Sequence, residues 1–179
     1  SGEWTAYSNE FSIAPNSKNI IYVKVTDTAG NVGYASSQGI ILYTDAVQKT
    51  QSVSFTKRGT ADVTAEVTLH GNTIDKIYCD STLLASGTHY TVSGETITFK
   101  ATWLDTLSAG DYTLTLHYNP LGEKYVSGDG NNDAPATTSI TLKVQKATGS
   151  VMNLSDISKV YDGKVVSDVT YNKLSTGRG

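Results

Sequence analysis

The chain has little cysteine, proline or methionine, and its scarcity of cysteine limits both cross-linking and metal binding. Its 179 residues include one cysteine, Cys79, three prolines and one methionine. A single cysteine cannot form an intrachain disulfide, and it excludes the structural zinc sites that use several thiolates. The cysteine content leaves the redox compartment of the protein open.

Long hydrophobic runs and an excess of positive charge are also lacking. The longest apolar run, from Gly39 to Tyr43, is far shorter than the ~20 residues of a membrane helix. The net charge of -3 argues against a nucleic-acid partner, because binding a polyanion requires clustered Lys and Arg. The chain opens with SGEW, without a start Met or a basic leader, and we expect it to be a piece of a longer protein.

Hydroxyl-bearing residues are abundant instead. The sequence contains 19 Ser and 25 Thr, about a quarter of the chain. Branched Thr side chains are stiff at χ1 and pack well on a pleated surface. This composition favours strands and turns over helices.

The clearest strand pattern covers residues 63–70. Val63 and Val67 share one face with Ala65 and Leu69, whereas Thr and Glu alternate on the other face, as in a strand with one buried side. His70, Gly71 and Asn72 supply the following turn. Further strands are expected at 74–79, 88–92, 95–100, 111–118 and 138–144. So many short strands predict an antiparallel immunoglobulin-like β-sandwich, an all-β fold.

One segment interrupts the alternation between the predicted strands. In ATWLDTLSAG, residues 101–110, Ala101, Leu104 and Leu107 recur every three residues, and Gly110 stands where a helical turn would end. We expect a helix of one or two turns that closes one end of the sandwich, with Trp103 and Leu107 in the core. Residues 119–136 carry two of the three prolines and several Gly and Asp, and predict a long loop.

The first 45 residues predict about three strands, too few to close a sandwich. Ile21, Val23 and Val25 alternate with polar residues, which predicts a half-buried strand. The residues 27–31 that follow, DTAGN, are typical of a hairpin turn, because Asp, Gly and Asn suit reversals. We therefore expect residues 1–45 to be the C-terminal part of a β-domain.

The central segment resembles a known family. Residues 50–145 are similar to the X2 family, the carbohydrate-binding X2 modules, which have an immunoglobulin-like fold. The similarity lies in the following landmarks: Asp62 with Val63, the turn Gly71-Asn72, the HYTVSG stretch at 89–94, Leu104, Leu107 and Gly110. His89 and Trp103 depart from the Asp and Tyr that are common at those places. The resemblance implies a module that accompanies polysaccharide-degrading enzymes and surface proteins.

The two ends resemble other bacterial surface modules. VKVTDTAGNVGY, residues 23–34, is similar to the last hairpin of bacterial immunoglobulin-like repeats, and ISKVYDGK, residues 157–164, to the opening of MBG-type repeats. These resemblances divide the chain into three parts. The parts are 1–45, the end of an immunoglobulin-like domain; 46–145, the X2-like module; and 146–179, a linker with the start of an MBG-like module.

Candidate catalytic groups are sparse. His70, His89 and His117 have no spacing typical of a metal site or a catalytic triad. Asp105 and Asp111 flank the predicted helix, but hydrolysis of a glycoside requires two carboxylates across a sugar cleft, and we interpret both as turn residues. The sequence predicts neither an enzyme nor a cofactor.

Two sets of residues remain candidates for binding. Exposed aromatic rings can stack on sugars, and the chain has 11 Tyr and two Trp; the rings proposed for carbohydrate are Trp4, Tyr118 and Tyr125. GDGNNDA, residues 128–134, places oxygen ligands at alternate positions and suggests a calcium ion; its candidate ligands are Asp129, Asn131 and Asp133.

The sequence thus leaves two functions open. The first is a non-catalytic spacer module of a multidomain bacterial protein, secreted or on the cell surface, whose partners are the neighbouring β-modules. The second is an adhesion module that binds a polysaccharide or a cell-wall glycan. Neither function involves nucleic acid or a membrane span in this segment.

Overall fold

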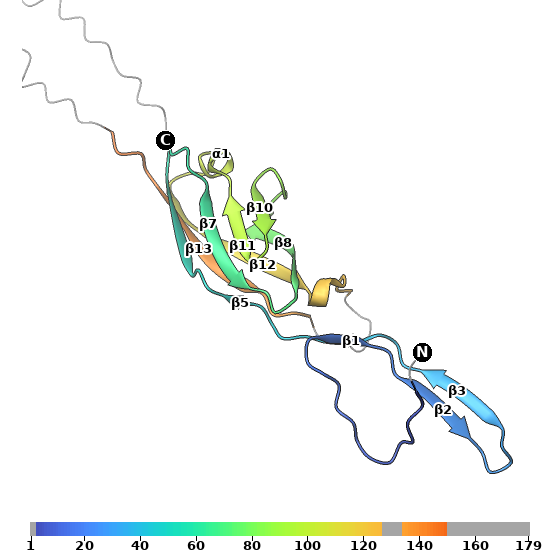
Figure 1. Cartoon of the computed structure of the whole chain (residues 1–179). Helices are drawn as coiled ribbons and strands as arrows, with labels where there is room; N and C mark the ends of the chain where they lie inside the picture. Colours follow the sequence, from blue (N-terminus) through green and yellow to red (C-terminus); the bar gives the residue numbers. More distant parts are fainter. Residues whose placement is uncertain (1–2, 127–133, 150–179) are drawn as a thin grey trace, which may run out of the picture.

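The computed structural model describes residues 3–126 and 134–149. Its central part is a sandwich of two β-sheets that face each other (Figure 1). One sheet has the strand order β10-β11-β7-β5 and the other the order β6-β13-β12-β8-β9. The strands are β5 Val47–Gln48, β6 Ser52–Thr56, β7 Val63–Thr68, β8 Thr73–Cys79, β9 Thr82–Leu83, β10 Tyr90–Ser93, β11 Thr96–Phe99, β12 Gly110–Asn119 and β13 Thr138–Gln145. The predicted all-β immunoglobulin-like sandwich is confirmed.

Alternating residues of both sheets fill the space between them. Ala65 and Val67 of β7 are buried, as are Leu114 and Leu116 of β12, whereas their chain neighbours Thr64 and Glu66 face solvent. Period-two burial is the consequence of the pleat, which sends successive side chains to opposite faces. The core extends along the chain from Ala46 to Val144.

The first two strands of the sandwich, β5 and β6, depart from a purely antiparallel arrangement. The chain pairs Val47 and Gln48 with β7 in one sheet and then crosses over, so that β6 joins the other sheet. There β6 runs parallel to β13, with Ser52 opposite Thr141. Neither β5 nor β6 was predicted from the sequence, and the parallel pair of β6 and β13 departs from the predicted antiparallel sandwich.

The predicted short helix is α1, Ala101–Leu104. Leu104 is fully buried and Trp103 is 8% exposed, so both belong to the core as expected. Leu107 is partly buried against that core. The prediction that Gly110 ends the helical turn was wrong, because the helix ends at Leu104 and Gly110 already begins β12, paired with Val144.

Four strands form an N-terminal extension beyond one end of the sandwich (Figure 1). They are β1 Ser17–Asn19, β2 Tyr22–Thr26, β3 Val32–Ser36 and β4 Ile40–Leu42, paired as β1 with β4 and β2 with β3. The expected hairpin of β2 and β3 is present, but all ten of its residues are exposed. The prediction of a half-buried strand was wrong, because the described residues bury neither face of this pair.

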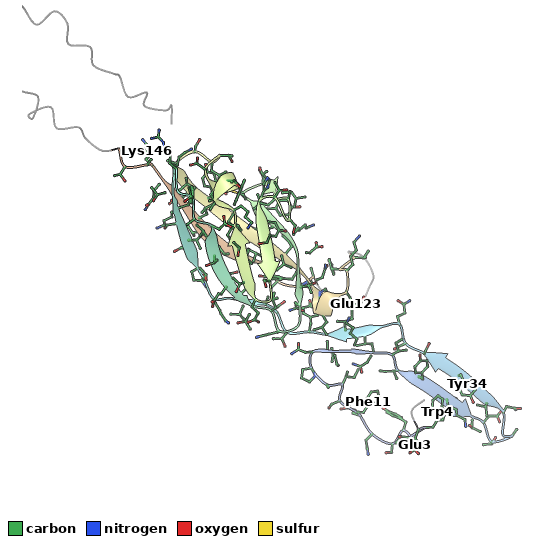
Figure 2. The ribbon with its side chains drawn as sticks, turned by 45° about the horizontal axis from the view of Figure 1, so that its top comes forward. Glu3, Trp4, Phe11, Tyr34, Glu123 and Lys146 are labelled. Atoms are coloured by element: carbon green, nitrogen blue, oxygen red, sulfur yellow. The ribbon has the colours of Figure 1, made fainter. Side chains whose placement is uncertain are left out.

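The chain enters and leaves the sandwich at opposite ends. β5 follows directly from the N-terminal extension, whereas β13 ends at the far pole beside α1 (Figure 1). Lys146, just after β13, and Glu123, near the extension, mark these two poles in Figure 2. Among the described residues, no helix has the length and apolar character to cross a membrane.

Candidate functional site

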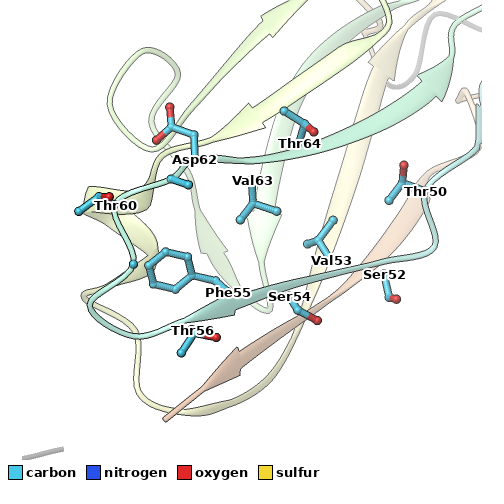
Figure 3. Close-up of a pocket in the computed structure, with 12 residues that line it drawn as sticks. Thr50, Ser52, Val53, Ser54, Phe55, Thr56, Thr60, Asp62, Val63 and Thr64 are labelled. Carbon is cyan, nitrogen blue, oxygen red and sulfur yellow. The ribbon is translucent and has the colours of Figure 1, made fainter. Parts of the chain in front are cut away.

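An open groove of about 610 Å³ lies along the edge where the two sheets part, between β6 and β7. Figure 3 shows Val53, Phe55 and Val63 directed into the space between these strands, with Ser54 on the other side of β6. Thr50, Thr60 and Thr64 are also among the lining residues. The groove therefore has an apolar floor and hydroxyl groups at its border.

Two strand edges border this groove. β6 pairs only with β13, so its other side is a sheet edge. β5 pairs only with Val67 and Thr68, which leaves β7 without a strand partner on that side from Val63 to Ala65. Phe55, the one aromatic lining residue, is 4% exposed. The groove can offer hydrogen bonds, but it has no exposed ring on which a sugar could stack.

Two carboxylates next to the groove have structural contacts. Asp62 accepts a hydrogen bond from the Ala101 N–H at 2.8 Å and pairs with Lys100 at 3.0 Å. Asp105 accepts from the Arg58 N–H at 2.6 Å. The Ala101 N–H, and after it Lys100, hold the pKa of Asp62 below its ordinary value. Both carboxylates tie α1 to the β6–β7 loop, which agrees with the interpretation of Asp105 as a turn residue.

The histidines are dispersed, as the sequence indicated. His89 stacks on Trp103 with 5.6 Å between ring centroids, and its Nδ1 accepts from the Ala85 N–H at 3.1 Å. His117 packs edge-on against Tyr78 at 5.4 Å. Over residues 3–126 and 134–149, no cluster of three or more His, Cys, Asp or Glu is arranged to hold a metal ion.

The aromatic candidates proposed for carbohydrate are separated by the structure. Trp4 is 54% exposed and contacts Tyr34, 67% exposed, with ring centroids 5.8 Å apart (Figure 2). Tyr22 lies on the same face of the β2–β3 hairpin as Tyr34, because the register places Lys24 opposite Tyr34. The alternation of residues 22–26 already indicated that Tyr22 and Lys24 share a face, but neither Tyr22 nor Tyr34 was predicted as a binding residue.

Tyr118 is not available for stacking on a sugar. It is 3% exposed, its hydroxyl is hydrogen-bonded to Thr138, and burial raises its pKa. The choice of Tyr118 as an exposed ring was wrong, because β12 turns this position toward the core. Tyr125 is partly exposed, and its N–H donates to Asn119 at 3.1 Å. The proposed calcium ligands Asp129, Asn131 and Asp133 lie outside the described residues.

The lone thiol is in the core rather than in a site. Cys79 is 6% exposed. Burial, with the charge of Asp80 as a second cause, raises the pKa of the thiol to about 11. At neutral pH the nucleophilic thiolate is therefore scarce.

Comparison with known families supports the assignment of the central segment. Residues 48–126 match the carbohydrate binding domain X2. The same chain is 42% identical over 59 residues to cellulose-binding protein A of Clostridium cellulovorans. The match covers 33% of this chain, and the chain spans about 3% of the length of that relative.

Several solved structures match part of this chain at low sequence identity. A tri-modular endo-β-1,4-glucanase from Bacillus licheniformis is 24% identical, with a TM-score of 0.43 over 57% of this chain and 18% of that one. The endo-β-1,4-glucanase B of Bacillus halodurans is 20% identical, with a TM-score of 0.41 over 57% of this chain and 17% of that one. A titin tandem of immunoglobulin domains is 12% identical, with a TM-score of 0.36 over 72% of this chain and 63% of that one.

The family match covers the sandwich from the end of β5 through β12 and leaves β13, Thr138–Gln145, outside it. It begins at the end of β5 and ends after β12 and the short 3-10 helix η1, Pro120–Gly122. The X2 domain is a non-catalytic accessory module. The predicted resemblance to the X2 family is thus confirmed over residues 48–126.

Proposed function

We propose that this chain is a non-catalytic spacer segment of a larger bacterial protein that is secreted or carried on the cell surface. The observation that carries the proposal is the placement of chain entry and exit at opposite poles of the sandwich (Figure 1). A module with its two connections at opposite ends sets its neighbours apart in line. A module with both connections at one pole would bring its neighbours together.

The separation achieved by one module follows from its strands. β6 and β13 are parallel, and both run from the extension toward the far pole. The eight residues of β13 span roughly 25 Å at about 3.4 Å per residue. We further propose that the chain divides into 1–45, 46–145 and 146–179, with the sandwich as the complete unit.

A second candidate function is binding of a polysaccharide. The observation that favours it is the pair of exposed, touching rings of Trp4 and Tyr34, since an exposed ring face can cover the apolar face of a pyranose. The names of the matched domain and of the curated relative, carbohydrate binding domain X2 and cellulose-binding protein A, point the same way. Tyr125 is a further candidate in this function.

Retention on insoluble cellulose and on a glycan array separates the two functions. For a spacer, the wild-type chain and a Trp4→Ala/Tyr34→Ala double variant should both remain at background. A binding function requires retention of the wild type that falls to background in the double variant. Tyr7→Ala is the matched control, because Tyr7 is a ring of the same extension and is 80% exposed. Retention that survives in Tyr7→Ala but not in the double variant would overturn the pure spacer.

A further inference from the structure

Asn72 occupies a position unlike that of any other described polar residue. It lies in the turn between β7 and β8 at the pole next to the N-terminal extension, and it is 2% exposed. Among residues 3–126 and 134–149, it is the single buried residue of polar or charged type. Burying a carboxamide is unfavourable unless its hydrogen bonds are made, so its partners identify what the position stabilises.

The partners of Asn72 belong to two other segments. Its Nδ2 donates to the carbonyl oxygen of Thr44 at 2.7 Å, and its Oδ1 accepts from the Leu121 N–H at 3.1 Å. Thr44 is in the link between β4 and β5, whereas Leu121 is in η1 after β12. One amide side chain therefore joins the link, the β7–β8 turn and the end of β12.

The backbone around Asn72 adopts conformations that need support. Leu121 has φ 47° and ψ 35°, in the left-handed region that a leucine rarely adopts. Gly71 has φ 85°, and a Cβ at this position would lie 3.1 Å from the Leu121 side chain. Strained residues persist where surrounding contacts hold them. The hydrogen bond from Leu121 to Asn72 supplies such a contact.

Further contacts fix the link from its other sides. Asp45 accepts from the Ala136 N–H at 2.9 Å, so the link is also bound to the segment that leads into β13. The Thr44 N–H donates at 2.8 Å to the Oδ1 atom of Asn16, the residue just before β1. Ala46, the next residue, is 7% exposed and belongs to the core of the sandwich. No residue from 44 to 46 is without such a contact.

An ion pair spans the same boundary at the surface. Lys18 of β1 lies 2.6 Å from Glu123, which follows η1 (Figure 2). Both side chains are about half exposed, and an exposed pair of this kind contributes little to stability. Its value here is geometric, since it places β1 beside η1.

We infer that residues 44–46 form a fixed joint, in which Asn72 sets the orientation of the N-terminal extension relative to the sandwich. Neighbouring domains with small interfaces are free to move unless specific contacts hold them. Here the buried amide of Asn72 and the carboxylate of Asp45 hold the link to the sandwich, and the Lys18–Glu123 ion pair holds β1 beside η1. The inference rests on the spacer function and deepens it, because a fixed joint makes the spacer a stiff one.

The test is the distribution of distances between two spin labels, measured by pulsed electron paramagnetic resonance. Labels at Thr26→Cys on β2 and Ser54→Cys on β6 are both exposed, in a Cys79→Ala background. The wild-type chain should give one narrow distribution. Asn72→Ala should broaden it about two-fold or more, toward the free motion expected of unfixed domains. A wild-type distribution already as broad as that of Asn72→Ala, or equal narrow widths in both, would overturn the joint.

A second pair of variants keeps the test decisive if Asn72→Ala unfolds. Asp45→Ala removes the acceptor of the Ala136 N–H on the link and should broaden the distribution. Asp62→Ala is the matched control, because it removes an exposed acceptor of a backbone N–H at the opposite pole, and should leave the width unchanged. Equal widths in the two variants would contradict the fixed joint.

Failure of the joint and failure of the spacer can be told apart. A broad distance distribution in the wild-type chain would overturn the fixed joint and leave the spacer function intact. Retention of the wild-type chain on a glycan would overturn the spacer function and leave the joint intact.

Discussion

At the scale of single residues, several of the described carboxylates accept hydrogen bonds from backbone N–H groups. Asp27 closes the β2–β3 turn by accepting from Ala29 and Asn31, and Glu95 accepts from Leu69. The pKa of Asp27 is lowered mainly by the hydrogen bond that its carboxylate accepts from the Asn31 side chain. These acidic residues, like Asp62 and Asp105 at the other pole, thus hold turns and loops in place.

Asp62 allows this role to be tested by pH. Its pKa is below the ordinary value of 3.8 in the folded chain, so the ionised form stabilises the fold at any pH above that value. This stability is lost as pH falls through the lower pKa of the folded state. We expect Asp62→Asn to melt below the wild type at pH 7, with a difference that shrinks on acidification below pH 3.8.

Thermal melts followed by circular dichroism between pH 7 and pH 2 provide the measurement. Asp111→Asn is the control, because Asp111 is an exposed carboxylate at the start of β12. Its melting temperature should follow that of the wild type at every pH. A gap for Asp62→Asn that stays constant down to pH 2 would show that the charge of Asp62 does not stabilise the fold.

At the scale of elements, α1 closes one end of the sandwich through a few side chains. The helix has four residues, too few to be stable alone, so packing must hold it. Leu104 is fully buried, and Trp103 contacts Phe99 at 6.1 Å between ring centroids. Asp62 and Asp105 connect both sides of the helix to the β6–β7 loop.

Truncation of Leu104 should therefore cost much more than truncation of its exposed neighbour. Leu104→Ala removes a fully buried side chain and should lower the free energy of unfolding by about 2–5 kcal/mol. Thr102→Ala changes an exposed residue of the same helix and should stay within about 0.5 kcal/mol of the wild type. Urea denaturation gives both values. Equal values for the two variants would mean that the helix does not complete the core.

At the scale of the whole molecule, the buried core and the exposed apolar residues are in different parts. All residues of the core cluster lie between Ala46 and Val144. Within residues 3–126 and 134–149, ten of the fourteen exposed large hydrophobic residues lie between Trp4 and Leu42. The sandwich therefore has a core of its own, whereas the extension depends on contacts at the joint.

A fragment of residues 46–149 should fold without the extension. It retains the entire core cluster and loses only joint contacts such as the ion pair of Lys18 with Glu123. Differential scanning calorimetry should show one cooperative transition, within a few degrees of the main transition of the full chain. The lost contacts should change the stability of the sandwich by no more than ~1 kcal/mol, and a change of that size shifts the melting temperature of such a domain by about 4–8 °C. Absence of a cooperative transition would contradict the proposed boundary at residue 46.

Much of the sandwich was predictable because its signals are local. The alternation at 63–69 predicted β7, and the Ser93-Gly94 turn joins β10 to β11, which pair as a hairpin. Strands β5 and β6 were not predicted, although Val53 and Phe55 alternate with Ser and Thr. β5 has two residues, too few for a periodic signal, and its pairing with β7 depends on a segment distant in the sequence.

The sequence by itself determined the β-fold, the X2 resemblance and the absence of a thiolate metal site, because period, turn residues and composition are properties of neighbouring positions. Only the tertiary structure decided which rings are exposed: Tyr118 faces the core, and Trp4, which precedes the first strand, contacts Tyr34 of β3. It also decided the role of Asn72, whose partners lie 28 and 49 positions away. Burial and long-range hydrogen bonds depend on which segments meet in space, and the alternation of residues along one strand does not determine which distant segments pack against it.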